Sequence, residues 1–75
     1  MSTDLRRIVA DILDHRPDEI DDGFGPAVSD RWDSLRHLRI ITAVEDEFGI
    51  RFSMEEIQSI DGFAALQRLV ASKAA

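Results

Sequence analysis

Apolar residues recur every three or four positions in three stretches of the chain, a spacing that predicts three main helices. The first stretch runs from about Asp4 to His15, with one apolar stripe and charged residues facing away. The stripe consists of Leu5, Ile8, Val9, Ile12 and Leu13. Ser2 or Thr3 can cap the start of this helix. Pro17 is expected to stop it, because the residue before a proline avoids helical geometry.

The second stretch has the strongest helical pattern and runs from Ser34 or Leu35 to Phe48. Six of its apolar residues form one stripe at this spacing, opposite a face of charged residues. They are Leu35, Leu38, Ile40, Ile41, Val44 and Phe48. Gly49 follows directly and is well suited to the left-handed conformation that ends many helices.

The last third of the chain predicts a short helix and a third main helix. Ser53-Met54-Glu55-Glu56 forms a capping box, and the short helix it opens would turn Ile57 and Ile60 inward. Asp61 is expected to cap the final helix, with Gly62 in its first turn. The buried stripe of that helix would be Phe63, Leu66, Leu69 and Val70. We therefore predict an all-α fold, a small four-helix bundle with a long loop between its first two helices.

Residues 16–32 form that loop, because two prolines and two glycines interrupt any regular pattern. Ile20, Phe24 and Val28 are spaced apolar residues that we expect to pin the loop across the helices. The acidic run from Asp18 to Gly23 resembles a calcium loop only superficially. It has Ile20 at the third ligand position and Ser29 at the twelfth, where a glutamate is needed. We interpret these carboxylates as a solvated acidic face.

Composition narrows the possible functions. Seventy-five residues predict a single domain, residues 1–75, and the absence of cysteine excludes disulfides and thiolate metal sites. His15 and His37 are too few for a zinc site unless carboxylates join them, and His15 fits a stabilising role at a helix end. A net charge of −6 disfavours nucleic acid and anionic membranes as partners. With no signal peptide or membrane span apparent, we expect a cytoplasmic, monomeric protein.

Ser34 is the main candidate for chemistry, because its hydroxyl lies where the loop becomes a helix. His37 and Asp33 could complete a hydrolytic triad, which would make the protein a small serine hydrolase. Asp33 is adjacent to the serine, however, and cannot easily orient the imidazole. The simplest structural role for Ser34 is a helix cap, but Asp33 can fill that role. The free hydroxyl would then stand at a positive helix end, where a phosphodiester is favoured.

Three segments together resemble the acyl carrier protein family. Asp33-Ser34-Leu35 is followed by Val44-Glu45-Asp46-Glu47-Phe48-Gly49-Ile50 and then by Phe52-Ser53-Met54-Glu55-Glu56-Ile57, at matching spacing. Length, acidity, long first loop and four-helix plan extend the resemblance to essentially the whole chain. The resemblance implies that the protein is not an enzyme. It implies instead a carrier with 4′-phosphopantetheine on Ser34, taken from coenzyme A and holding acyl or aminoacyl groups as thioesters. Its implied partners are a phosphopantetheinyl transferase, an acyl- or aminoacyl-loading ligase or transferase, and downstream biosynthetic enzymes.

The chain departs from fatty-acid carriers near the serine. Those carriers typically have acidic residues soon after it, whereas this chain has Arg36 and Arg39. We therefore expect a specialised pathway, such as polyketide, aminoacyl or saccharide-modifying acyl transfer. Ile57 and Leu66 replace smaller residues of the family, which favours a filled interior and a short or polar cargo. The predicted docking residues are Asp33, Leu35, Arg36, Leu38, Arg39, Thr42, Glu45 and Asp46.

Two questions remain open at this level. Trp32 precedes Asp33 where the family has a small residue, and we favour a core anchor over an exposed docking surface. An unmodified helical adaptor that acts only by docking would share most of the sequence pattern. Modification of Ser34 distinguishes the carrier from this adaptor.

Overall fold

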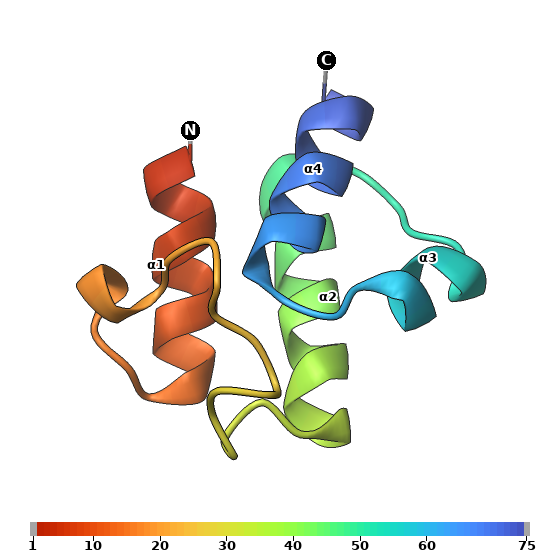
Figure 1. Ribbon diagram of the computed structural model, residues 1–75. Helices are drawn as coiled ribbons and strands as arrows, with labels where there is room; N and C mark the ends of the chain where they lie inside the picture. Colours follow the sequence, from red (N-terminus) through yellow and green to blue (C-terminus); the bar gives the residue numbers. More distant parts are fainter. Residues whose placement is uncertain (1, 75) are drawn as a thin grey trace.

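The computed structural model describes residues 2–74, which form four α-helices and one short 3-10 turn (Figure 1). The elements are α1 (Ser2–Leu13), η1 (Pro17–Glu19), α2 (Ser34–Phe48), α3 (Met54–Ser59) and α4 (Phe63–Ala74). Residues 2–74 contain no strand. The predicted all-α fold with three main helices, one short helix and a long first loop is confirmed.

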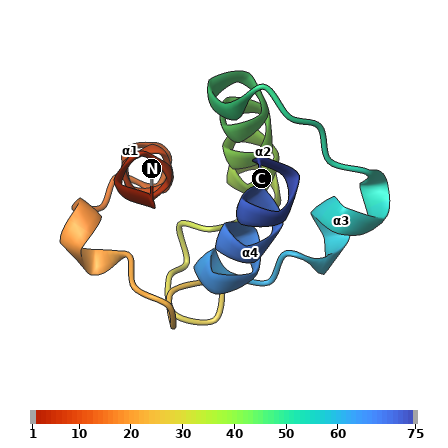
Figure 2. The ribbon, with the colours of Figure 1, turned by 90° about the horizontal axis from the view of Figure 1, so that it is seen from above.

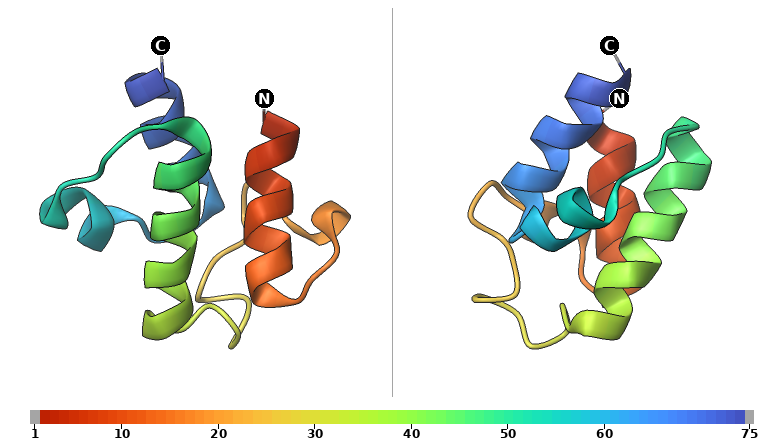
Figure 3. Two further views of the ribbon diagram at one scale, coloured as in Figure 1. Left: turned by 180° about the vertical axis from the view of Figure 1, so that it is seen from behind. Right: turned by 90° about the vertical axis from the view of Figure 1, so that its right-hand side faces the viewer.

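The three long helices lie side by side, and α3 stands apart from them. Seen from above, α1 lies on one side of α2 and α4, and α3 lies on the other (Figure 2). Helix α1 runs in the opposite direction to α2 and α4 (Figures 1 and 3). The start of α2 therefore lies at the end of the molecule opposite the start of α1 and the end of α4.

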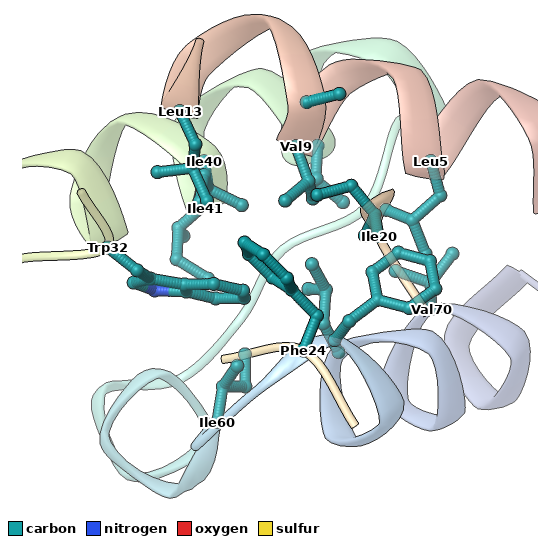
Figure 4. Close-up of a cluster of buried hydrophobic side chains, with 14 of the residues drawn as sticks. Leu5, Val9, Leu13, Ile20, Phe24, Trp32, Ile40, Ile41, Ile60 and Val70 are labelled. Atoms are coloured by element: carbon teal, nitrogen blue, oxygen red, sulfur yellow. The ribbon is translucent and has the colours of Figure 1, made fainter. Parts of the chain in front are cut away.

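The long loop contributes three side chains to the core alongside those of the helices. Ile20, Phe24 and Trp32 are 1%, 5% and 4% exposed, and their side chains point in among those of α1, α2 and α4 (Figure 4). The rings of Phe24 and Trp32 lie 6.2 Å apart. Trp32 is thus a core anchor, as favoured by the sequence. The prediction for Val28 is wrong, because this side chain is 68% exposed and packs in no core position.

Helix α1 ends two residues earlier than predicted. Asp14 takes a left-handed conformation with φ 59°, and the N–H of His15 donates to the carbonyl of Ala10 at 2.9 Å. This is a Schellman-type stop, which Asp tolerates better than most residues. His15 therefore lies in the loop, and Pro17 opens η1 instead of ending α1. The side chains of the predicted caps, Ser2 and Thr3, lie outside the part of the chain that the structure describes.

Two glycines let the loop cross the start of α4. A Cβ atom on Gly25 would lie 2.8 Å from the carbonyl oxygen of Asp61, and one on Gly62 would lie 2.8 Å from that of Phe24. The N–H of Phe63 donates to the same Phe24 carbonyl at 2.9 Å. Gly62 thus precedes α4 and permits a close backbone approach. It does not lie in the first helical turn, and it takes the capping position predicted for Asp61.

Helix α3 begins with the predicted capping box. Ser53 Oγ accepts from the N–H of Glu56 at 3.1 Å, and the Glu56 carboxylate accepts from the N–H of Ser53 at 2.8 Å. Glu56 also pairs with Lys73 Nζ of α4 at 2.9 Å. The Ser53 N–H, and then Lys73, lower the pKa of Glu56 from its ordinary value of 4.5. This carboxylate ties the short helix to α4.

Candidate functional site

Asp33 caps α2 and leaves the Ser34 hydroxyl free. Asp33 has an extended backbone, and its carboxylate accepts from the N–H of Arg36 at 2.8 Å. Its carbonyl accepts from the N–H of His37 at 2.8 Å, which closes the first helical turn. Ser34 follows as the first helical residue and is exposed. The arrangement expected from the sequence, with Asp33 as cap and Ser34 in the first turn, is present.

The backbone around Ser34 can accommodate an anion. The first N–H groups of a helix have no intrahelical acceptor, and the helix dipole makes this end positive. Among the hydrogen bonds of residues 2–74, none uses the backbone N–H of Ser34 or of Leu35. A phosphate ester on the serine oxygen would thus lie beside two free donors. These residues fit a phosphodiester-linked group.

His37 is occupied on both ring nitrogens. Its Nδ1 lies 2.8 Å from Trp32 Nε1, and its Nε2 lies 2.8 Å from the carbonyl oxygen of Ile57. An indole N–H can only donate and a carbonyl can only accept, so Nδ1 accepts and Nε2 carries the proton. Neither nitrogen is free to take a proton from Ser34. The hydrolase alternative therefore fails, since the Asp33 carboxylate is also engaged on the backbone of Arg36.

His37 also explains an error in the predicted core face of α2. The side chains nearest the core are His37, Ile40, Ile41, Val44 and Phe48, which follow helical spacing. At about 100° per residue, Leu35 then lies almost opposite this face and Leu38 more than a quarter turn away from it. They are 62% and 53% exposed, so the prediction that they share one stripe with Ile41 and Val44 is wrong. Helical spacing predicts the core-facing side correctly once His37 is counted among its residues.

A surface groove opens beside Ser34, between the start of α2 and α3. Its volume is about 610 Å³, and most of its lining is apolar. The principal side chains are Trp32, His37, Leu38, Met54, Ile57 and Ile60. Ile60 is buried as predicted, whereas Ile57 is only half-buried and forms part of the groove wall. Leu66 is fully buried in the core.

The chain matches no protein-family model and no curated protein sequence. It is similar to the solution NMR structure of a holo acyl carrier protein from Geobacter metallireducens, with 28% sequence identity and a TM-score of 0.84. The match covers 97% of this chain and 86% of that one. The chain thus has the fold of an acyl carrier protein, and the similarity supports a general role as a carrier protein rather than as an enzyme.

The eight docking residues predicted from the sequence fall into two groups. Five of the eight border one shallow depression on the exposed face of α2. They are Leu35, Leu38, Arg39, Thr42 and Asp46. The other three have structural contacts. Asp33 caps the helix, Arg36 donates to the carbonyl of Arg31 at 3.2 Å, and Glu45 accepts from the N–H of Phe52 at 2.9 Å.

The other histidine of the chain, His15, stabilises the long loop between α1 and α2. Its ring nitrogens lie 3.1 Å from the Glu19 carboxylate and 3.0 Å from Ser29 Oγ. The Arg16 N–H, and then His15, lower the pKa of Glu19. Residues 2–74 contain no cluster of three potential metal ligands. Over the same range, no helix combines the length and apolar character needed to cross a membrane.

Proposed function

We propose that Ser34 carries a 4′-phosphopantetheine arm and that the protein uses it to deliver acyl or aminoacyl groups to biosynthetic enzymes. The observation that carries this proposal is the exposed Ser34 hydroxyl in the first turn of α2, left free because Asp33 performs the capping. The similar protein from Geobacter metallireducens is a holo acyl carrier protein, which supports the same assignment.

The residues around Ser34 would hold the arm without taking part in its chemistry. When bound, the arm supplies a thiol that can hold cargo as a thioester, a group that a chain without cysteine lacks. The backbone N–H groups of Ser34 and Leu35 would stabilise the phosphate charge. The apolar groove lined by Trp32, Leu38 and Met54 offers a surface next to the attachment point.

The proposal includes the partners that such a carrier needs. A phosphopantetheinyl transferase would attach the arm, a loading ligase or transferase would add the cargo, and downstream enzymes would receive it. We place these steps in the cytoplasm and in a specialised pathway, with a monomeric carrier and a short or polar cargo. The fully buried Leu66 supports the cargo assignment, because it fills part of the helix bundle.

Intact mass spectrometry tests the assignment of Ser34. The protein is incubated with coenzyme A and a broad-specificity phosphopantetheinyl transferase. We expect a gain of about 340 Da, the mass of the transferred cofactor group. Ser34→Ala should abolish the gain. Ser53→Ala is the matched control, because Ser53 is also an exposed serine at a helix start, and it should leave the gain intact.

The adaptor alternative makes the opposite prediction for this experiment. A protein that acts only by docking would present the same exposed leucines on α2 but would gain no mass. Absence of the gain in a folded wild-type protein would therefore favour the adaptor and contradict the carrier. Folding is checked on the same sample by its helical circular dichroism.

A further inference from the structure

Large apolar side chains are exposed mainly around Ser34. Four such side chains are exposed on the described part of the chain: Val28, Leu35, Leu38 and Met54. Leu35 follows the serine directly, Leu38 lies one helical turn further on, and Met54 lines the groove that Ser34 also borders. Exposed apolar side chains gathered at one place commonly mark an interaction surface. We call Leu35, Leu38 and Met54 the apolar patch.

The charge beside this patch has the opposite sign to the charge of the whole chain. Residues 30–39 contain three arginines and two aspartates, which gives +1 against a net −6 for the protein. Two of these arginines are engaged on backbone carbonyls, Arg31 on Asp14 and Arg36 on Arg31. Arg39 is exposed and borders the same depression as Leu35 and Leu38.

Arg39 has no carboxylate near it on its own helix. The residues three and four positions away are Leu35, Arg36, Thr42 and Ala43. Arg39 takes part in none of the ion pairs found among residues 2–74. Its charge is therefore available to a partner that approaches the apolar patch.

Asp46, the acidic residue of α2 that borders the same depression, cancels this charge only in part. It lies seven residues beyond Arg39, which corresponds to about 10 Å along the helix axis. The Debye length at physiological ionic strength is about 8 Å. The nearer Asp33 carboxylate is engaged on the N–H of Arg36. A protein that contacts the start of α2 therefore meets the free charge of Arg39 beside the apolar patch, while the charge of Asp46 is partly screened.

We propose that the enzymes acting on the Ser34 arm dock through an apolar recess edged by carboxylates. Leu35, Leu38 and Met54 enter the recess, and Arg39 pairs with an acidic group at its edge. A partner with a basic edge is disfavoured by like-charge contact at Arg39. This inference rests on the proposed carrier function and adds the chemistry of the partner surface.

A crosslinking assay with two forms of one probe enzyme tests the partner chemistry. The carrier is loaded with a pantetheine analogue that bears an electrophile, and loading is verified by mass spectrometry. The probe is a condensing enzyme chosen for a docking patch of basic residues. Its second form has glutamate in place of the basic residues of that patch. Crosslinking rates are measured for wild type, Arg39→Glu and Arg51→Glu, the last an exposed arginine beyond the far end of α2.

We expect wild type to react at least about fivefold faster with the acidic form than with the basic form. Arg39→Glu should reverse this preference, and Arg51→Glu should behave as wild type. Added salt should speed the reaction of wild type with the basic form, because it screens the repulsion, and slow the reaction of Arg39→Glu with that form.

The opposite ordering would overturn the inference. A wild type that prefers the basic form, or a preference that Arg39→Glu leaves unchanged, contradicts it. Equal rates with both forms, including no measurable reaction with either, contradict it as well. Failure of the loading step instead refutes the carrier function itself, so the two failures are distinguishable.

Discussion

The two halves of α2 place the same types of residue in opposite surroundings. From Ile40 onward, the part that we call the second half, Ile40, Ile41 and Val44 are at most 3% exposed and form the centre of the core. In the first half, Leu35 and Leu38 are more than half exposed and border surface depressions near Ser34. One continuous helix thus has a half that holds the bundle together and a half that exposes apolar side chains to solvent. The presence of apolar residues in the sequence does not by itself distinguish the buried half from the exposed half.

His37 joins the two halves. It belongs to the exposed half by position, but it lies on the core-facing side of the helix and bonds to both Trp32 and Ile57. These bonds connect the end of the loop, the first turn of α2 and the short helix α3. The groove beside Ser34 therefore has a wall that is fixed by hydrogen bonds as well as by apolar packing.

Truncation of one apolar side chain in each half gives the largest expected contrast. Ile40→Ala removes a fully buried side chain and should lower the free energy of unfolding by about 2–5 kcal/mol. Leu38→Ala removes one that is 53% exposed and should cost less than about 1 kcal/mol. Urea denaturation followed by circular dichroism measures both. Equal losses would show that the two halves are not different in role.

A methyl group at Gly25 tests the loop that holds the exposed half in place. Gly25→Ala would bring Cβ within 2.8 Å of the Asp61 carbonyl and should cost about 1–3 kcal/mol of unfolding free energy. Gly23→Ala is the control, because its Cβ would have no contact closer than 3.6 Å. Denaturant midpoints of the two variants should differ clearly. A stable Gly25→Ala protein would contradict the close crossing of loop and α4.

Removal of the His37 imidazole tests the junction between the halves. His37→Ala leaves the Trp32 indole N–H and the Ile57 carbonyl without their partner and should cost about 1–2 kcal/mol. Trp32 is the only tryptophan, so its fluorescence reports on this site directly. We expect its emission to shift to longer wavelength as water reaches the indole. Ser34→Ala, in the same turn, should change neither the emission nor the stability.

The smallest effect concerns Glu56, which ties α3 to α4. Its pKa is lowered in the folded protein, so its stabilising contribution is present above about pH 4.5 and is lost as the pH falls through the lowered pKa. Glu56→Gln should therefore lower Tm at neutral pH, and the difference from wild type should shrink in acid. Exposed Glu55→Gln is the control and should follow wild type. A difference that stays constant down to pH 3 would contradict this assignment.

Local signals allowed much of the fold to be predicted from sequence. The Asp33 cap, the Gly49 stop and the Ser53–Glu56 box each depend on residues within one helical turn. They have the predicted geometry in the structure. The junction that exposes Ser34 is built from these same local interactions, which is why the candidate site could be located before the structure was known.

The errors have physical causes that the pattern of apolar residues does not show. Gly62 was predicted to lie in the first turn of a helix. Its close approach to Gly25 produces no local sequence pattern, because the two residues are far apart in the chain. Leu35 and Leu38 were placed on one stripe with Ile41 and Val44 because His37 was not counted among the residues of the core-facing side. Asp14 ends α1 in a conformation usually taken by glycine, and the prediction relied on Pro17 instead. Of the docking residues, Arg36 and Glu45 have structural contacts that sequence position alone could not indicate.

Localisation of the attached group at peptide level tests the central claim most directly. The protein is incubated with coenzyme A and a broad-specificity phosphopantetheinyl transferase, digested, and sequenced by tandem mass spectrometry. The account predicts that the arm is found on the peptide containing Ser34 and that the other serines are unmodified. An arm on Ser29, Ser53 or Ser59, or no modification of the folded protein, would contradict it.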